Sequence, residues 1–182
     1  MILLHACESL YFPRSLSIRS EETRRQYRLA IADFGKTLER VPDVTDLTDD
    51  NLALLYRWLL DVRKVCIVTA NERVGRLKAL GDFLWKRGYI PHGITLGRMR
   101  APRRTPCAWQ RDEIRRLLIA CRNFKGHLGG VPACAWWRAH LAWLWATGAR
   151  VGETLALRWE WIDFTHKVAH VPAEVRKGQS GD

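Results

Sequence analysis

The residue types best suited to chemistry lie in one short segment, Ala146–Glu153, with the sequence Ala-Thr-Gly-Ala-Arg-Val-Gly-Glu. The Thr-Gly pair predicts a turn between two helices, and this turn places Arg150 at the start of the second helix. There the guanidinium would lie beside free backbone N–H groups and the positive end of the helix dipole, which suits an anion. A guanidinium stays charged and can bind two phosphate oxygens at once. The spacing equally fits an ordinary surface arginine paired with Glu153, three residues further along.

The charge of the whole chain favours a polyanionic partner. Lys and Arg total 30 against 19 Asp and Glu, which gives a net charge of +11. Residues 1–90 carry 15 basic and 12 acidic side chains, whereas residues 91–182 carry 15 basic and 7 acidic ones. Such an excess of positive charge repels itself unless a polyanion relieves it, so nucleic acid is the first partner to consider.

Residues 91–106 are expected to be a basic linker between two domains. The segment has three prolines, two glycines and no acidic residue, a composition typical of a connecting segment. Its four arginines are Arg98, Arg100, Arg103 and Arg104. We expect them to follow DNA phosphates, and the alternative is a solvated basic loop. Arg73 and Arg76, on a helix expected at 69–87, are further candidates for DNA contacts.

The sequence argues against a membrane or secreted protein. The apolar opening has no basic residue ahead of it and is interrupted by Glu8, whereas a signal peptide begins with a positively charged region. The stretch 131–148 contains Arg138 and His140, and a membrane-spanning helix needs about 20 nearly uncharged residues. The five cysteines include no closely spaced pair. These features favour reduced thiols and a cytoplasmic location.

The elements that must position these residues are mostly helical. Apolar periodicity predicts helices over 20–40, from 49 to about 59 and over 69–87, which together form a compact module in residues 1–90. In the second half, helices are expected from about 110, over 135–146 and after Arg150. The alternating segment 167–172 predicts the first strand of a sheet. Its return strand is absent, so the sequence resembles one cut inside an element.

Two other interpretations of the second half are weaker. The tryptophans of the 135–146 helix could stack on bases, but at helical spacing we expect them in the core. They are Trp136, Trp137, Trp143 and Trp145. A zinc site would need Cys121, His127, Cys134 and His140, whose spacing lacks the close pairs of structural sites. We expect neither a metal nor a cofactor.

Residues 146–164, ATGARVGETLALRWEWIDF, resemble the segment around the first catalytic arginine of the tyrosine recombinases, the phage integrase family. The residues that match the pattern of this family are Thr147, Gly148, Arg150, Gly152, Glu153, Leu155, Leu157, Trp159 and Asp163. Trp161 departs from it, because polar residues are commoner there. Residues 69–90 resemble the last long helix of the family's core-binding domain, and residues 109–121 resemble the start of its catalytic domain.

The resemblance implies a mainly α fold. It comprises a helical, SAM-like core-binding domain in residues 1–90, the basic linker at 91–106, and the amino-terminal part of an α+β catalytic domain at 107–182. The two domains would clamp duplex DNA, and the protein could form a homo-oligomer on it. The implied function is site-specific DNA recombination or integration by cutting and rejoining DNA through a phosphotyrosyl intermediate.

The resemblance also implies roles for single residues. Arg150 would be the first of two arginines that hold the non-bridging phosphate oxygens, and Glu153 would orient it. Lys177 would be the acid that protonates the leaving hydroxyl, although a solvated turn lysine is the alternative. The family's second arginine, histidines and nucleophilic tyrosine follow this point, whereas the tyrosines here precede Arg150. They are Tyr11, Tyr27, Tyr56 and Tyr89. We therefore expect this chain not to cut DNA alone, and the alternative function is a non-catalytic DNA-binding protein on the same scaffold.

Overall fold

The computed structural model describes residues 1–15, 18, 20–102, 107–172 and 175. The chain divides into two compact units, unit 1 (Met1–Arg104) and unit 2 (Thr105–Asp182). Arg103, Arg104 and Lys177 lie outside the described residues. The fold is mainly α, as the sequence predicts, with two small antiparallel hairpins in unit 2.

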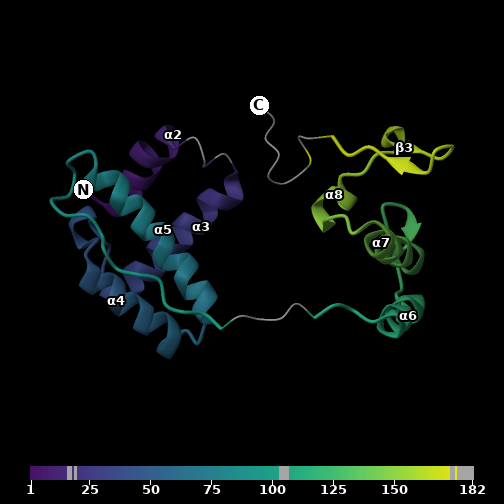
Figure 1. The fold of residues 1–182 in the computed structure, drawn as a ribbon, viewed down its shortest axis with the longest axis horizontal. Helices are drawn as coiled ribbons and strands as arrows, with labels where there is room; N and C mark the ends of the chain where they lie inside the picture. The colour runs from purple at the N-terminus through teal and green to yellow at the C-terminus, as the bar shows by residue number, and fades with distance from the viewer. Residues whose placement is uncertain (16–17, 19, 103–106, 173–174, 176–182) are drawn as a thin grey trace. The chain divides into compact units, whose positions relative to one another are not determined.

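Unit 1 is a helical bundle in which α3 packs against α4 and α5 (Figure 1). The three predicted helices are confirmed with shifted ends. The elements in chain order are α1 (Leu3–Ala6), the π-helical turn η1 (Cys7–Tyr11), α2 (Phe12–Arg14), α3 (Glu21–Leu38), the 3₁₀ turn η2 (Val44–Asp46), α4 (Asp49–Arg57), the π-helical turn η3 (Trp58–Val62) and α5 (Ile67–Trp85).

Local hydrogen bonds explain where the helices of unit 1 begin. The Ser20 hydroxyl accepts a hydrogen bond from the backbone N–H of Thr23 at 3.1 Å at the start of α3. Thr48 does the same for Asn51 at 3.3 Å at the start of α4. Such caps satisfy backbone donors that have no partner inside the helix. Helix α3 ends before Pro42, because Glu39 already has the left-handed conformation, with φ of 54°.

The core of unit 1 includes the first residues of the chain, where apolar periodicity predicted no helix. Leu3, Cys7 and Phe12 are buried with Phe34 and Leu80. Tyr11 lies in the same cluster, its ring 4.9 Å from that of Phe83 and 5.3 Å from that of Tyr27, measured between centroids. The apolar opening of the chain is therefore an element of the bundle.

Unit 2 begins with helix α6 (Arg111–Ala120), close to the predicted start. It continues through the 3₁₀ turn η4 (Cys121–Asn123), β1 (His127–Leu128), β2 (Val131–Pro132), α7 (Ala133–Thr147), α8 (Val151–Leu155), the 3₁₀ turn η5 (Trp159–Trp161), β3 (Ile162–Asp163) and β4 (Val168–Ala169). Gly129 and Gly130 form the two-residue turn between β1 and β2. Their φ values of 55° and 83° are the positive ones that such tight hairpins require.

The strand expected at 167–172 has a partner, so the prediction of an unpaired strand is wrong. Its core, β4, pairs antiparallel with β3, with Ile162 opposite Ala169 and Asp163 opposite Val168. The backbone N–H of His170 also donates to the carbonyl of Trp161 at 2.8 Å. The partner strand, β3, comes earlier in the chain, and its two residues are too few to show the alternation of apolar and polar side chains that predicts a strand.

The expectation that the tryptophans of α7 form a core is wrong in part. Trp137 and Trp145 are 36% and 52% exposed, whereas Trp136 and Trp143 are half-buried. Helical spacing therefore indicated an apolar helix, but it did not indicate how far each tryptophan is covered. No helix in the described part of the chain is long and apolar enough to cross a membrane.

Candidate nucleic-acid interface

The Thr147–Gly148 turn joins α7 to α8 as the sequence predicts. Gly148 ends α7 with φ of 65°, and its N–H donates to the carbonyl of Leu144. A left-handed residue at this position is strained unless it is glycine. The Thr147 hydroxyl donates to the carbonyl of Trp143 at 2.7 Å and accepts from the N–H of Ala149 at 3.2 Å. These bonds fix the direction in which the chain enters α8.

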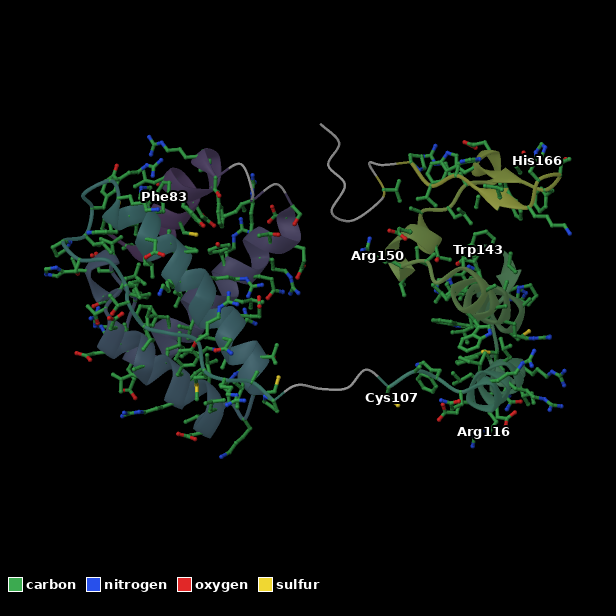
Figure 2. All side chains as sticks on the ribbon, in the orientation of Figure 1. Phe83, Cys107, Arg116, Trp143, Arg150 and His166 are labelled. Atoms are coloured by element: carbon green, nitrogen blue, oxygen red, sulfur yellow. The ribbon has the colours of Figure 1, made fainter. Side chains whose placement is uncertain are left out.

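Arg150 and Glu153 form a closed local arrangement at the start of α8. The Glu153 carboxylate accepts from the backbone N–H of Arg150 at 3.0 Å, and its other oxygen accepts from the Arg150 guanidinium at 3.1 Å. The Arg150 side chain is 64% exposed, while that of Glu153 is 15% exposed. Arg150 thus extends from the beginning of the helix (Figure 2) with its base held and its charge accessible. This geometry contains the ion pair considered from the sequence, with the Arg150 guanidinium exposed to solvent.

The other predicted DNA contacts divide into two groups. Arg98 and Arg100 are exposed. Arg73 is 16% exposed and lies 3.5 Å from the carboxylate of Asp33, which is 9% exposed. Burial lowers the pKa of Arg73, and Asp33 partly offsets this. Arg73 also donates to the backbone carbonyl of Gln26, an arrangement that stabilises the packing of α3 on α5.

Arg76 is also engaged within its own helix. Its guanidinium lies 3.3 Å from the carboxylate of Glu72 and donates to the Glu72 carbonyl at 2.8 Å. The side chain is 24% exposed. Of the four candidates that the structure describes in unit 1, Arg98 and Arg100 are more exposed than Arg73 and Arg76.

The segment expected to be a linker from residue 91 is held against unit 1 as far as Met99. Ile94 is 5% exposed. Asp49, at the start of α4, accepts hydrogen bonds from the backbone N–H groups of Thr95 and Leu96 at 2.9 and 3.0 Å. The Thr95 hydroxyl also donates to Asp49, and this bond lowers the pKa of that carboxyl. The proline and glycine content of residues 91–106 indicated an irregular backbone, but it did not indicate that Asp49 binds this backbone.

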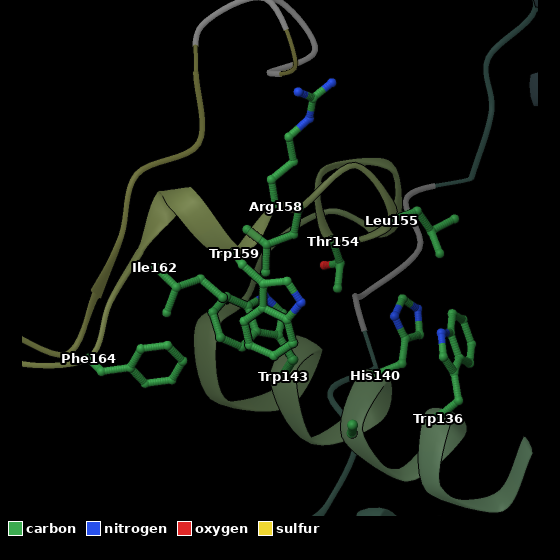
Figure 3. A pocket seen from close by; sticks show the side chains of 11 residues that line it. Trp136, His140, Trp143, Thr154, Leu155, Arg158, Trp159, Ile162 and Phe164 are labelled. Atoms are coloured by element: carbon green, nitrogen blue, oxygen red, sulfur yellow. The ribbon is translucent and has the colours of Figure 1, made fainter. Parts of the chain in front are cut away.

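Unit 2 has an apolar hollow of about 430 Å³ lined from α7, α8 and the segment that includes η5 and β3. Figure 3 shows its aromatic side chains, among them Trp136, Trp143, Trp159 and Phe164. Trp159 is 79% exposed and Phe164 72% exposed. The polar side chains that line it with them are His140, Thr154 and Arg158. No group of three or more metal-binding side chains occurs in the described part of the chain.

Comparison with known proteins gives one family. Residues 109–181 match the phage integrase family. The match covers α6 through β4 and includes Arg150 and Glu153, so the resemblance noted on the sequence is confirmed over this segment. Unit 1 lies outside the matched residues. No curated protein and no solved structure matches the chain.

Proposed function

We propose that the chain is a DNA-binding protein of site-specific recombination, in which Arg150 binds a phosphodiester group of duplex DNA. One observation carries the proposal: inside the phage integrase segment, Arg150 is 64% exposed while the more buried Glu153 holds it by two hydrogen bonds. A fixed, accessible guanidinium suits two phosphate oxygens, since its planar fork matches their geometry. The net charge of +11 supports a polyanionic partner.

The chemistry of strand transfer gives each proposed residue a role. During attack on a phosphodiester, negative charge accumulates on the non-bridging oxygens, and fixed cations stabilise it. Arg150 would supply one such cation, and Glu153 would keep its guanidinium in place. Lys177 would protonate the leaving oxygen as a general acid. Arg98, Arg100, Arg103 and Arg104 would neutralise neighbouring phosphates.

A salt titration of DNA binding tests this proposal. We expect the chain to bind a labelled duplex with an affinity that falls steeply as salt rises, because bound cations release counterions from DNA. Arg150→Ala should weaken binding and reduce the slope of log affinity against log salt by about 1. The measurement is fluorescence anisotropy at several salt concentrations.

Arg158→Ala is the matched control for this experiment. Arg158 lies in the same unit, is 68% exposed and has an acidic neighbour, Glu160, at 3.9 Å. Both variants remove one exposed positive charge. A larger loss of DNA affinity from Arg150→Ala would therefore come from the position of Arg150 and not from the loss of charge alone. Absence of wild-type binding at low salt, or equal effects of the two substitutions, would contradict the proposed role of Arg150.

The second candidate, a non-catalytic DNA-binding protein, is favoured by the tyrosines. Tyr11 and Tyr27 are each 7% exposed and their hydroxyls lie 3.0 Å apart. Tyr56 is 6% exposed and donates to Asn71. Burial raises the pKa of both Tyr27 and Tyr56, which opposes the deprotonation that attack requires.

A nicked suicide substrate separates the two candidate functions. We expect the 182-residue chain to give no covalent adduct after denaturing electrophoresis, because three of its four tyrosines are buried in unit 1. A protein–DNA adduct would instead favour the catalytic candidate and identify Tyr89, which is 42% exposed, as the tyrosine to substitute next.

A further inference from the structure

Residues 94–100, here called the basic strap, cross α5 in close contact with it. Ile94 packs over Gly81, where a β-carbon would clash with the end of the Ile94 side chain. The contact is possible because glycine leaves the helix surface open at that point. Leu96 is also partly buried against the core. The apolar half of the strap is therefore fixed to the bundle.

Polar contacts continue this attachment toward the arginines. Lys78, on α5, donates to the backbone carbonyl of Leu96 at 3.1 Å. Asn71, two turns earlier on the helix, makes a reciprocal pair with Met99: its amide donates to the Met99 carbonyl at 2.8 Å, and its side-chain oxygen accepts from the Met99 N–H at 3.0 Å. Both backbone groups of one strap residue are thus bound by one side chain.

The Asn71 side chain is itself held in place. Its oxygen accepts a second hydrogen bond, from the hydroxyl of the buried Tyr56, at 2.9 Å. A fixed amide that binds the backbone of Met99 also fixes the two residues on either side of it. Those residues are Arg98 and Arg100, the exposed arginines of the strap.

Arg98 and Lys78 lie beside the same hollow of about 280 Å³ on unit 1. A terminal nitrogen of the Arg98 guanidinium comes within 3.5 Å of the position that a β-carbon on Gly75 would take, so the side chain lies across α5. Asp82 also lines the hollow and is its acidic member. Asp49, which accepts from the backbone of Thr95 and Leu96, lies close enough to Lys78 to interact with its charge. Arg98 is the more exposed of the two cations beside the hollow.

We propose that Asn71 is a positioning residue that sets the strap so that Arg98, with Lys78, binds a DNA backbone phosphate. This inference rests on the proposed DNA-binding function and adds to it how Arg98, one of the proposed phosphate contacts, is held on unit 1. Two cations at fixed positions suit a phosphate better than cations on a free segment, because less side-chain and backbone freedom is lost on binding.

A double-mutant cycle tests the proposal on the full chain. Arg98→Ala should weaken duplex binding roughly three- to tenfold and reduce the salt slope by about 1. Asn71→Ala should produce a similar loss, because Arg98 is no longer held. The double variant should bind about as well as either single variant, since both remove one contact. Asp82→Asn should strengthen binding.

Asn51→Ala is the matched control for a merely structural effect. Asn51 is also half-buried in unit 1, and its amide likewise donates to a backbone carbonyl, that of Asp46, at 2.9 Å. Its hydrogen bonds are to Thr48 and Asp46 and not to the strap, so its replacement should lower stability without changing DNA affinity or salt slope. If Asn71→Ala fails to fold, Met99→Pro replaces it in the cycle, because proline lacks the N–H that donates to the Asn71 side-chain oxygen.

The outcomes distinguish this inference from the proposed function. The positioning role would be overturned, while DNA binding itself stands, if Asn71→Ala bound DNA with wild-type affinity. It would also be overturned if the loss of affinity in the double variant equalled the product of the losses in the two single variants. An equal effect of Asn51→Ala would overturn it too, because stability alone would then account for the loss. Failure of the wild type to bind at low salt would reject the DNA-binding function instead.

Discussion

Unit 1 has a core of buried large apolar side chains, whereas the described residues of unit 2 leave theirs half-buried or exposed. Phe34, Leu77 and Leu80 in unit 1 are fully buried, while Leu155 and Trp159 in unit 2 are 60% and 79% exposed. The two units therefore hold their charged residues by different means. In unit 1, long-range packing fixes the strap; in unit 2, neighbouring residues fix Arg150.

The difference shows that a precise local arrangement does not require a closed core. The Thr147–Gly148 turn and the Arg150–Glu153 pair form within a few residues of one another, through hydrogen bonds of 2.7–3.2 Å. In unit 1, the removal of apolar area from water contributes roughly 25 cal/mol per Å² and stabilises the whole bundle. Substitutions should therefore affect the two units unequally.

The largest expected effect is the loss of core packing in unit 1. Leu80→Ala should lower the free energy of unfolding of unit 1 by about 2–5 kcal/mol, because it removes buried methyl groups and leaves a cavity. Leu155→Ala, at an exposed site of unit 2, should change stability by no more than about 0.5 kcal/mol. Native-state hydrogen exchange of the α5 amides in a denaturant series measures the loss in unit 1, and that of α8 measures the control. Equal losses would remove the contrast between the units.

An intermediate effect is expected from acid. Arg40 donates two hydrogen bonds to Asp46, at 2.5 and 2.7 Å, and these lower the pKa of that carboxyl below its ordinary value of 3.8. A lowered pKa means that the carboxylate stabilises the fold above about pH 4, and that this contribution is lost as the pH falls through the native pKa. Asp46→Asn should lower the stability of unit 1 by about 1–2 kcal/mol at neutral pH and flatten its dependence on acid pH.

Asp163 is the counterpart in unit 2. The backbone N–H of His166 lowers the pKa of Asp163, and the His166 ring lies 2.7 Å from it. Its side chain is 40% exposed, against 11% for Asp46. Asp163→Asn should leave the acid profile of unit 1 unchanged. Hydrogen exchange of the α5 amides, measured in urea series at several pH values, gives the stability of unit 1 for both variants. If Asp163→Asn flattened its dependence on acid pH as much as Asp46→Asn does, the Arg40–Asp46 pair would not be the cause of that dependence.

The smallest effect should be a gain. Gly75 lies inside α5 without a positive φ, and a β-carbon there would meet the Arg98 guanidinium at an ordinary contact distance of 3.5 Å. Gly75→Ala should stabilise unit 1 by about 0.5–1 kcal/mol, because alanine loses less backbone freedom in a helix. Gly152→Ala in α8 should leave unit 1 unchanged. Thermal unfolding measures both, and a destabilised Gly75→Ala would show that the strap needs the bare helix surface there.

The sequence predicted what neighbouring residues decide. The helices expected over 20–40 and from 49 begin where Ser20 and Thr48 cap them, since a capping hydroxyl and its backbone donor are three residues apart. Arg150 and Glu153 are equally close, so the ion pair could be foreseen. The segment with the most specific pattern is also the one that matches the phage integrase family.

The tertiary structure alone decided the contacts between distant residues. Asn71 meets Met99 across 28 residues, and Asp49 meets Leu96 across 47. Nothing in the local pattern of the 91–106 segment indicates which side chains will bind its backbone, because that depends on how α4 and α5 pack. For the same reason the sequence could suggest that Arg98 binds phosphate, while the bundle determines where its charge is held.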